Sequence, residues 1–211
     1  PRVMTERTLI NFHIHSTGSD GKMAPEEVVK EALAAGIKYM CFTDHYPEPG
    51  GDIESSKWKT QGFHSKEYKS EIVRLQQAYK GQIDISFGVE MDWFEKFQAW
   101  TKKEIAKNNF DYVLGSVHKV PLGNKYFSFD FGDNHEELFM KVVSEFGSIE
   151  SLIAAYYKEL RLLIKSGMYD AVGHFDYVKR YNTNQKIFSE ETESYRKIVM
   201  DKMIKCLKLK V

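Results

Sequence analysis

The 211-residue sequence is short of cysteine, of long apolar runs and of any excess of charge. Its two cysteines, Cys41 and Cys206, exclude a disulfide framework and favour a reducing, cytoplasmic setting. No apolar run approaches the roughly 18 residues that a membrane-spanning helix needs, and we expect no secretory signal. Thirty basic and thirty acidic residues cancel, which argues against a nucleic-acid patch or a membrane-binding face. We therefore expect a small-molecule substrate and no nucleic-acid or membrane partner.

The sequence also lacks the short motifs of nucleophilic and nucleotide-binding loops. It contains no Gly-x-Ser-x-Gly elbow and no Gly-x-x-x-x-Gly-Lys loop, and Cys41 lies within an apolar strand pattern. These absences exclude the usual serine nucleophile and the Walker-type phosphate cradle. A hydroxide generated on a metal ion is the remaining nucleophile that we expect, provided that the chain supplies metal ligands.

Strand-like and helix-like segments alternate along the chain. The expected strands are 8–12, 37–43, 83–89, 110–117 and 169–173. The expected helices are 25–35, 65–79, 98–107, 134–146, 148–166 and 189–208. Long loops are expected at 46–64 and 119–132. This alternation predicts an α/β fold, with a parallel sheet or barrel, in a single domain covering residues 1–211.

Each expected strand ends in a side chain that can bind a metal ion. His13 and His15 end the first strand two positions apart, so their imidazoles point the same way. The residues at the later strand ends are His45, Glu90, His118 and His174, and Asp20 follows the first strand on a loop. For any one histidine, a hydrogen-bonded core position is the commoner alternative. Since the C-terminal ends of parallel strands gather at one rim, however, five such histidines predict a multinuclear site for Zn²⁺, Mn²⁺ or Fe.

Five segments together resemble the PHP (polymerase and histidinol phosphatase) superfamily. They are Asn11–Asp20, Thr43–His45, Gly88–Glu90, Gly115–His118 and Gly173–Asp176, and their order is most similar to the monofunctional histidinol-phosphate phosphatase branch. The resemblance implies a distorted, TIM-like, seven-stranded (β/α) barrel that holds up to three divalent metal ions (Zn, Mn or Fe). The metal ligands that it implies are His13, His15, Asp20, His45, Glu90, His118 and His174.

The final motif of that family, an Asp-x-His near the C-terminus, is absent from this sequence. The chain ends at Lys208–Val211, where we expect a sixth strand to begin, so we expect a barrel truncated before its last strands. By the resemblance, an ion on Glu90, His118 and His174 keeps its protein ligands, whereas the other two ions each lack one. We expect reduced activity from the truncated chain, and a metal-binding but inactive remnant is an alternative.

The expected chemistry is the hydrolysis of a phosphate monoester. Clustered divalent ions lower the pKa of a bound water and neutralise phosphoryl oxygens, so a hydroxide bridging two ions is the expected nucleophile. We expect Glu90, Asp20 and His118 to carry this chemistry. Arg180 is the best candidate for binding the phosphate, because a guanidinium can pair with two phosphate oxygens, and Lys119 is the second candidate. A solvated loop charge is the alternative for both cations.

Further residues fall on the loops expected at the same rim. The acids considered for a cationic substrate are Asp92, Glu95 and Asp130. The aromatic residues considered as pocket walls, with core packing as the alternative, are Trp58, Phe63, Trp93 and Phe127. The two remaining histidines, His64 and His135, are expected at the surface.

The sequence thus predicts a metal-dependent phosphomonoesterase, and the resemblance implies L-histidinol phosphate as its substrate and histidine biosynthesis as its pathway. Another phosphoesterase of the same superfamily, acting on a nucleotide or on phosphotyrosine, is the alternative. The neutral charge argues against a polymerase-associated nuclease, which must bind a polyanion. A metal-dependent amidohydrolase also begins with His-x-His on a barrel strand, but it normally has a bridging lysine at a later strand end, and none is expected here.

Overall fold

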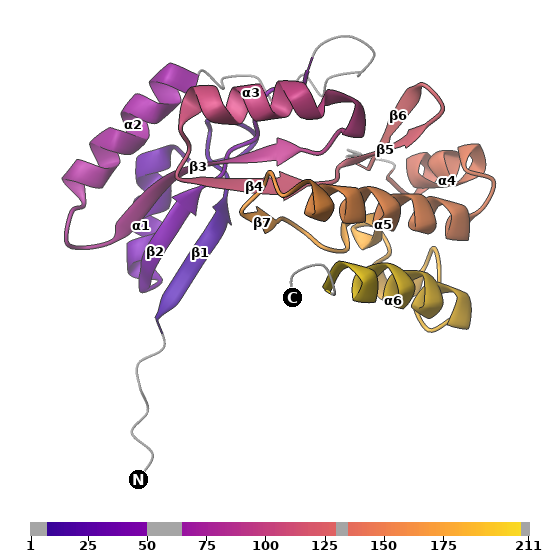
Figure 1. Cartoon of the computed structure of the whole chain (residues 1–211). Helices are drawn as coiled ribbons and strands as arrows, with labels where there is room; N and C mark the ends of the chain where they lie inside the picture. Colours follow the sequence, from indigo (N-terminus) through magenta and orange to yellow (C-terminus); the bar gives the residue numbers. More distant parts are fainter. Residues whose placement is uncertain (1–7, 50–64, 130–134, 208–211) are drawn as a thin grey trace. The chain divides into compact units, whose positions relative to one another are not determined.

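The computed structural model describes residues 8–49, 65–129 and 135–207, and the chain forms two compact units (Figure 1). The described residues of unit 1 are 8–48, 65–91 and 103–114. Those of unit 2 are 49, 92–102, 115–129 and 135–207. Each unit is described by itself. The single barrel domain expected over residues 1–211 stays a prediction.

Strands and helices alternate in unit 1, as the sequence predicts. Its elements are β1 (Leu9–Ile14), α1 (Pro25–Ala34), β2 (Ile37–Phe42), α2 (Ser65–Ala78), β3 (Asp84–Asp92) as far as Met91, the later part of α3 (Gln98–Asn108) and the start of β4 (Tyr112–Ser116). β1 pairs in parallel with β2, and β2 with β3. The hydrogen-bonded strand order in this unit is β1-β2-β3-β4, the order in which these strands occur along the chain.

Local sequence signals set the bounds of α1. Pro25 occupies the first helical turn, where its missing N–H costs nothing, and Glu26 and Glu27 favour the positive end of the helix dipole. The Glu27 carboxylate also accepts a hydrogen bond of 2.9 Å from the backbone N–H of Ala24. Gly36, with a φ of +78°, follows the last turn, because a residue without a Cβ adopts this conformation at little cost.

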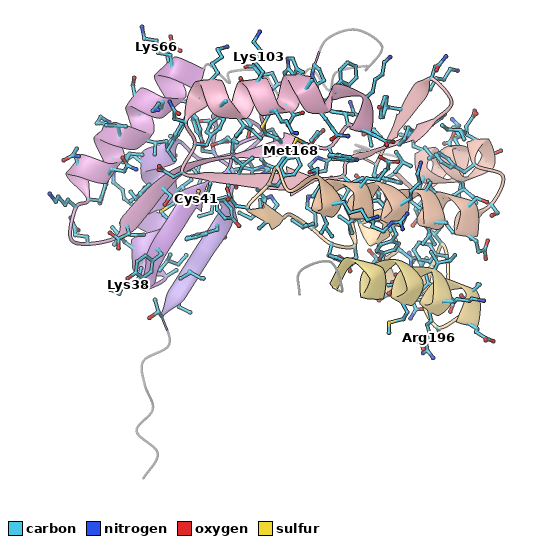
Figure 2. All side chains as sticks on the ribbon, viewed as in Figure 1. Lys38, Cys41, Lys66, Lys103, Met168 and Arg196 are labelled. Atoms are coloured by element: carbon cyan, nitrogen blue, oxygen red, sulfur yellow. The ribbon has the colours of Figure 1, made fainter. Side chains whose placement is uncertain are left out.

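The middle of the parallel sheet in unit 1 is covered on both faces. Met40, Cys41 and Phe42 are consecutive in β2 and all fully buried, which is typical of parallel strands between helical layers. Cys41 accordingly lies inside the fold, whereas Lys66 and Lys103 extend from α2 and α3 at the surface (Figure 2). The packing is so close that a Cβ on residue 88 would lie 2.4 Å from the sulfur of Cys41. Gly88 is therefore required for β2 and β3 to approach each other.

Unit 2 contains the remaining helices and a hairpin. Its elements after β4 are β5 (Lys119–Leu122), β6 (Lys125–Ser128), α4 (His135–Glu145), α5 (Ile149–Ser166), β7 (Ala171–Val172), the short 3₁₀ turns η2 (Tyr177–Lys179) and η3 (Thr183–Gln185), and α6 (Glu193–Leu207). A further 3₁₀ turn, η1 (Glu95–Phe97), precedes α3. The N–H of Gly173 donates to the carbonyl of Gly115 at 2.9 Å, which ties the end of β7 to β4.

Helix α5 forms the centre of the apolar core of unit 2. Its buried side includes Leu152, Tyr156 and Leu160, which belong to one cluster of apolar side chains with Phe129 and Phe139. Repeating apolar residues three and four positions apart place one face of the helix against this cluster. Burial of each large side chain contributes about 1.5–3 kcal/mol to the hydrophobic stabilisation.

The structure corrects one expected loop. Residues 119–128 were expected to be irregular, but they form an antiparallel hairpin in which Lys119 pairs with Ser128 and Leu122 with Lys125. The turn is Gly123-Asn124, and Gly123 has a φ of +59°. A Gly-Asn pair between two β-favouring runs is a hairpin signal, and it accounts for the hairpin that replaces the expected loop.

Several expectations fall outside the described residues. These are most of the 46–64 loop, the sixth strand expected to begin at 208, and the residues Trp58, Phe63, His64 and Asp130. Within the described part of the chain, no helix is both long and apolar enough to cross a membrane.

Candidate metal centre

Three imidazoles of unit 1 surround one carboxylate oxygen of Glu90. The distances to Oε2 of Glu90 are 3.3 Å from Nε2 of His13, 2.9 Å from Nε2 of His15 and 3.2 Å from Nδ1 of His45. The Glu90 side chain is completely buried, and a buried carboxylate is costly unless positive charge and hydrogen bonds compensate it. Ligand atoms of His13, His15 and Glu90 all lie within 4.8 Å of one another, which fits coordination of one ion.

Asp20 completes a second group of donors in the same unit. Its Oδ1 lies 2.7 Å from Nδ1 of His15, and its Oδ2 lies 3.7 Å from Nε2 of His45. Both imidazoles therefore have one nitrogen facing Glu90 and the other facing Asp20. Ligand atoms of His15, Asp20 and His45 again lie within 4.8 Å of one another. Two neighbouring donor groups that share histidines are the arrangement expected of a multinuclear site.

The two carboxylates control the protonation of His15. Burial lowers the pKa of His15, but its hydrogen bonds to Asp20 and Glu90 outweigh burial and raise the pKa to about 10. Burial raises the pKa of Asp20, but the hydrogen bond from His15 and the charges of His45 and His15 together outweigh it and lower the pKa to about 2. In the metal-free protein, positive charge on His15 thus compensates the two carboxylates.

The parallel sheet explains why His45 and Glu90 meet. Past the end of β2, the chain continues alongside β3, with the N–H of Glu90 donating to the carbonyl of Asp44 at 3.1 Å. The N–H of Tyr46 in turn donates to the carbonyl of Glu90 at 2.8 Å. His45 and Glu90 are consequently bridge partners on adjacent segments, and their side chains point the same way.

A buried aspartate holds the loop that carries His15 and Asp20. Asp44 is fully buried, and its carboxylate accepts hydrogen bonds from the N–H and the hydroxyl of Ser16, both at 2.8 Å, and from the hydroxyl of Ser19 at 2.7 Å. In the sequence, Asp44 is part of the Thr43–His45 segment, and no separate role is predicted for it. The available signal was an acid at the end of an apolar strand, together with two serines in the loop after His-x-His.

Unit 2 contributes a pair of histidines. Nε2 of His118 and Nε2 of His174 lie 3.0 Å apart, and Nδ1 of His118 is hydrogen-bonded to Oδ1 of Asp92. A carboxylate on one nitrogen fixes the tautomer and orientation of a histidine whose other nitrogen binds a metal. His118 and Asp92 are both buried. Asp92, which was considered as a substrate-binding acid, thus contacts a candidate ligand instead.

Arg180 lies beside this pair, next to a cavity of unit 2. The cavity has a volume of about 420 Å³ and is lined by His174, Asp176, Tyr177, Lys179, Arg180 and Glu190. The guanidinium of Arg180 is 5.2 Å from the ring centre of Tyr177, and its Nη1 donates a hydrogen bond to the hydroxyl of that tyrosine. Lys179 instead forms ion pairs with Glu190 at 2.8 Å and Asp176 at 3.0 Å, which raise its pKa.

Lys119, Trp93 and Glu95, which the sequence also singles out, lie in different surroundings. Lys119 is buried at the first position of β5, so the alternative of a solvated loop charge is wrong for it. Trp93 is a core residue rather than a pocket wall, since it is buried and its Nε1 donates to Glu159 at 3.0 Å. Glu95 is exposed in η1.

The two remaining residues pack against aromatic rings. Phe127 contacts Phe146 edge-on, at 5.6 Å between ring centres. His135 was expected at the surface, but it is half-buried and stacks on Tyr181 at 4.6 Å. Neither of these contacts involves a candidate metal ligand.

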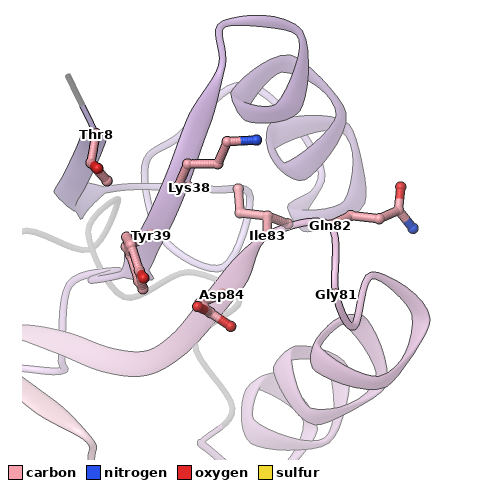
Figure 3. A pocket seen from close by; sticks show the side chains of 7 residues that line it. All are labelled: Thr8, Lys38, Tyr39, Gly81, Gln82, Ile83 and Asp84. Carbon is pink, nitrogen blue, oxygen red and sulfur yellow. The ribbon is translucent and has the colours of Figure 1, made fainter. Parts of the chain in front are cut away.

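A second cavity lies in unit 1, at the N-terminal ends of its strands. It has a volume of about 290 Å³ and is lined by Thr8, Lys38, Tyr39, Gly81, Gln82, Ile83 and Asp84. Figure 3 shows Lys38 and Gln82 extending away from Asp84, so the polar groups do not converge on one point. The candidate ligands instead occupy the C-terminal ends of the same strands, where active sites of α/β folds occur.

The Asp44 network predicts a large loss of stability when its carboxylate is removed. Asp44→Ala leaves the N–H and the hydroxyl of Ser16 buried without this acceptor, so we expect the free energy of unfolding to fall by about 3 kcal/mol. Asp84→Ala, at an exposed position of β3, should change it by less than about 0.5 kcal/mol. Urea denaturation of both variants tests this, and equal changes would contradict the proposed role of Asp44.

The raised pKa of His15 predicts how the stability of the metal-free protein depends on pH. A histidine whose pKa is about 10 when folded and 6.5 when unfolded stabilises the fold fully below pH 6.5, and this stabilisation disappears as the pH rises towards 10. Chelator-treated protein should therefore lose stability between about pH 7 and about pH 10. His15→Gln should lose less over this range in urea denaturation. Parallel pH profiles for the two proteins would contradict the assignment.

Known proteins are similar to this chain in sequence and in fold. The histidinol-phosphatase of Lactococcus lactis is 31% identical over 190 residues, which cover 87% of this chain and 64% of the relative. A solved structure from Listeria monocytogenes has a TM-score of 0.77 at 18% identity and covers 95% of this chain and 78% of that chain. A second solved structure is that of histidinol phosphate phosphatase from Lactococcus lactis complexed with zinc, L-histidinol and phosphate. Its TM-score is 0.65 at 24% identity, and the match covers 95% of this chain and 69% of that chain.

These likenesses confirm the predicted fold class, an α/β fold of the distorted TIM-like barrel type. The matches to curated relatives span 58% and 64% of the length of the first two of them. The PHP domain family itself matches residues 11–206, which is nearly the whole sequence. The chain therefore belongs to the PHP domain family.

Proposed function

We propose that this chain is a metal-dependent phosphomonoesterase that hydrolyses L-histidinol phosphate to L-histidinol and phosphate in histidine biosynthesis. The observation that carries the proposal is the buried carboxylate of Glu90 with three imidazole nitrogens within 3.3 Å of one of its oxygens. The names of the relatives support the substrate, because histidinol-phosphatases are among the proteins most similar to this chain. The cytoplasmic location and the role in a biosynthetic pathway stay predictions.

The donor set fits divalent transition metals. Imidazole nitrogens with carboxylate oxygens suit zinc, and they also accept manganese and iron, so we propose up to three ions of this kind. The residues that would hold them are His13, His15, Asp20, His45 and Glu90 in unit 1 and His118 and His174 in unit 2. When bound, such ions lower the pKa of water and neutralise the phosphoryl oxygens of an ester.

The side chains around the donors prepare them for this role. Asp20 and Glu90 contact opposite nitrogens of His15, which fixes the plane of its ring. Asp92 does the same for His118 from the Nδ1 side, leaving Nε2 to face His174. Because Glu90 and Asp92 are buried, His15 and His118 keep one orientation and lose little conformational entropy when an ion binds.

We propose Arg180 as the residue that binds the phosphate of the substrate. It is exposed at the cavity of unit 2 that also exposes His174, and a guanidinium offers paired donors to two phosphate oxygens. Lys179, beside it, is already engaged by two acids. Lys119 remains the second candidate, although it is buried in β5, and Glu90, Asp20 and His118 remain the proposed catalytic residues.

The proposal predicts a selective, metal-dependent phosphatase activity. Purified chain loaded with zinc or manganese should release phosphate from L-histidinol phosphate faster than from a nucleoside monophosphate or phosphotyrosine, as measured by a colorimetric phosphate assay. A chelator should abolish the activity, and adding the metal back should restore it.

The alternatives give different results in the same assay. A preference for the nucleotide or for phosphotyrosine would assign the chain to another phosphoesterase of the family. Metal binding without hydrolysis of any of the esters would contradict the proposed activity and leave a protein that binds metal without catalysis.

A further inference from the structure

Tyr177 lies between the histidine pair of unit 2 and the guanidinium of Arg180. Its ring centre is 4.1 Å from that of His174 and 4.8 Å from that of His118. The guanidinium of Arg180 lies over the same ring at 5.2 Å. One largely buried aromatic ring thus contacts two candidate metal ligands and the candidate phosphate-binding cation.

The backbone on either side of Tyr177 is tied to its surroundings by another tyrosine. The N–H of Tyr177 donates to the hydroxyl of Tyr156 at 3.1 Å, and that hydroxyl donates to the carbonyl of His174, also at 3.1 Å. Tyr156 is fully buried in α5, so one rigid group fixes both ends of the segment. The position of the Tyr177 ring against His174 is therefore set by the core of unit 2.

The hydroxyl of Tyr177 has a different partner from its ring. It accepts a hydrogen bond from Nη1 of Arg180, while the aromatic face attracts the same cation. Lys179 gives a useful contrast, because its ammonium is paired with Asp176 and Glu190. Of these two neighbouring cations at the cavity, Arg180 is the one that contacts the rings of Tyr177 and Tyr181.

The loop that follows is built to keep this arrangement. Oδ1 of the buried Asn182 accepts the N–H groups of Ile187 and Phe188, both at 3.0 Å. Its Nδ2 donates to the carbonyl of Phe188 at 3.0 Å and to Glu190 at 3.3 Å. Glu190 also forms an ion pair with Lys179. The loop from Asn182 to Glu190 is therefore held at Asn182 and at Glu190, close in sequence to Arg180.

We propose that Tyr177 is a positioning residue with two separable roles. Its ring orients His118 and His174 for metal binding, and its hydroxyl holds the guanidinium of Arg180 where it binds a phosphoryl group. The inference rests on the proposed function for the identity of the ester, but it concerns phosphate recognition by the metal-loaded protein, which is measured without turnover.

The test compares variants of the metal-loaded chain, with inorganic phosphate as the probe. Tyr177→Phe keeps the ring and removes the hydroxyl. We expect unchanged metal content and unchanged thermal midpoint, but about tenfold weaker phosphate binding by calorimetry, since a hydrogen bond to a charged group is lost. Any turnover should show a raised KM with a smaller change in kcat. Tyr177→Leu, which removes the ring as well, should also lower the metal content measured by elemental analysis.

Two further variants make the result specific. Tyr181→Phe is the matched control, because the Tyr181 ring also lies near Arg180, at 5.5 Å, and this substitution keeps the ring. Phosphate binding by this variant should stay within about twofold of the wild type. Arg180→Lys should weaken phosphate binding, and adding Tyr177→Phe to it should cause little further loss, since both changes remove one interaction.

The outcomes separate this inference from the proposed function. Phosphate binding by Tyr177→Phe equal to that of the wild type, or no phosphate binding by the wild type, would overturn the inference. Loss of metal from Tyr177→Phe would also overturn it, because the hydroxyl would then be structural. If the wild type binds metal and phosphate as expected but does not hydrolyse histidinol phosphate, the proposed function fails and the inference stands.

Discussion

The carboxylate of Glu90 is buried, and its negative charge requires compensation. Three imidazole nitrogens surround one of its oxygens in unit 1, and the hydrogen bonds of His15 to Asp20 and Glu90 raise the pKa of that histidine to about 10. A charged group of this kind is retained in a protein interior only when it is paired or binds a cation. Backbone packing and the contacts of Asp44 in unit 1 keep these donors together.

Close backbone packing is the first of those features. Gly88 allows β2 and β3 to approach, so that the segment after β2 continues beside β3 and brings His45 to Glu90. Asp44, immediately before His45, points into the loop after β1 and holds it through Ser16. Asp44, which follows β2, thereby positions the loop after β1 that carries His15 and Asp20. The donors of this cluster consequently depend on the packing of the sheet as much as on their own side chains.

Much of the fold and of the donor set could be predicted from the sequence, because both follow from periodic local patterns. His15, His45 and Glu90 lie at or just after strand ends, which predicts metal ligands at one edge of the sheet. Pro25 and Gly167 mark where helices begin and end. The supporting residues were harder to predict. Asp44, Asp92 and Tyr177 act through contacts with residues distant in sequence, and nothing in their local pattern says which donor or ring they will meet. The hairpin at Gly123 differs from these residues, since its turn signal, a Gly-Asn pair, is local and present in the sequence.

The buried carboxylate of Glu90 and the donors around it form the proposed metal site, and metal content tests this most directly. Glu90→Gln removes the charge with little change in shape, while Glu95→Gln makes the same change at an exposed position of unit 2. Elemental analysis of the purified chains, grown in metal-supplemented medium, should find at least one transition-metal ion per chain in the wild type and in Glu95→Gln, and substantially less in Glu90→Gln. Equal metal content in all three, or a folded wild type that contains no metal, would contradict the account.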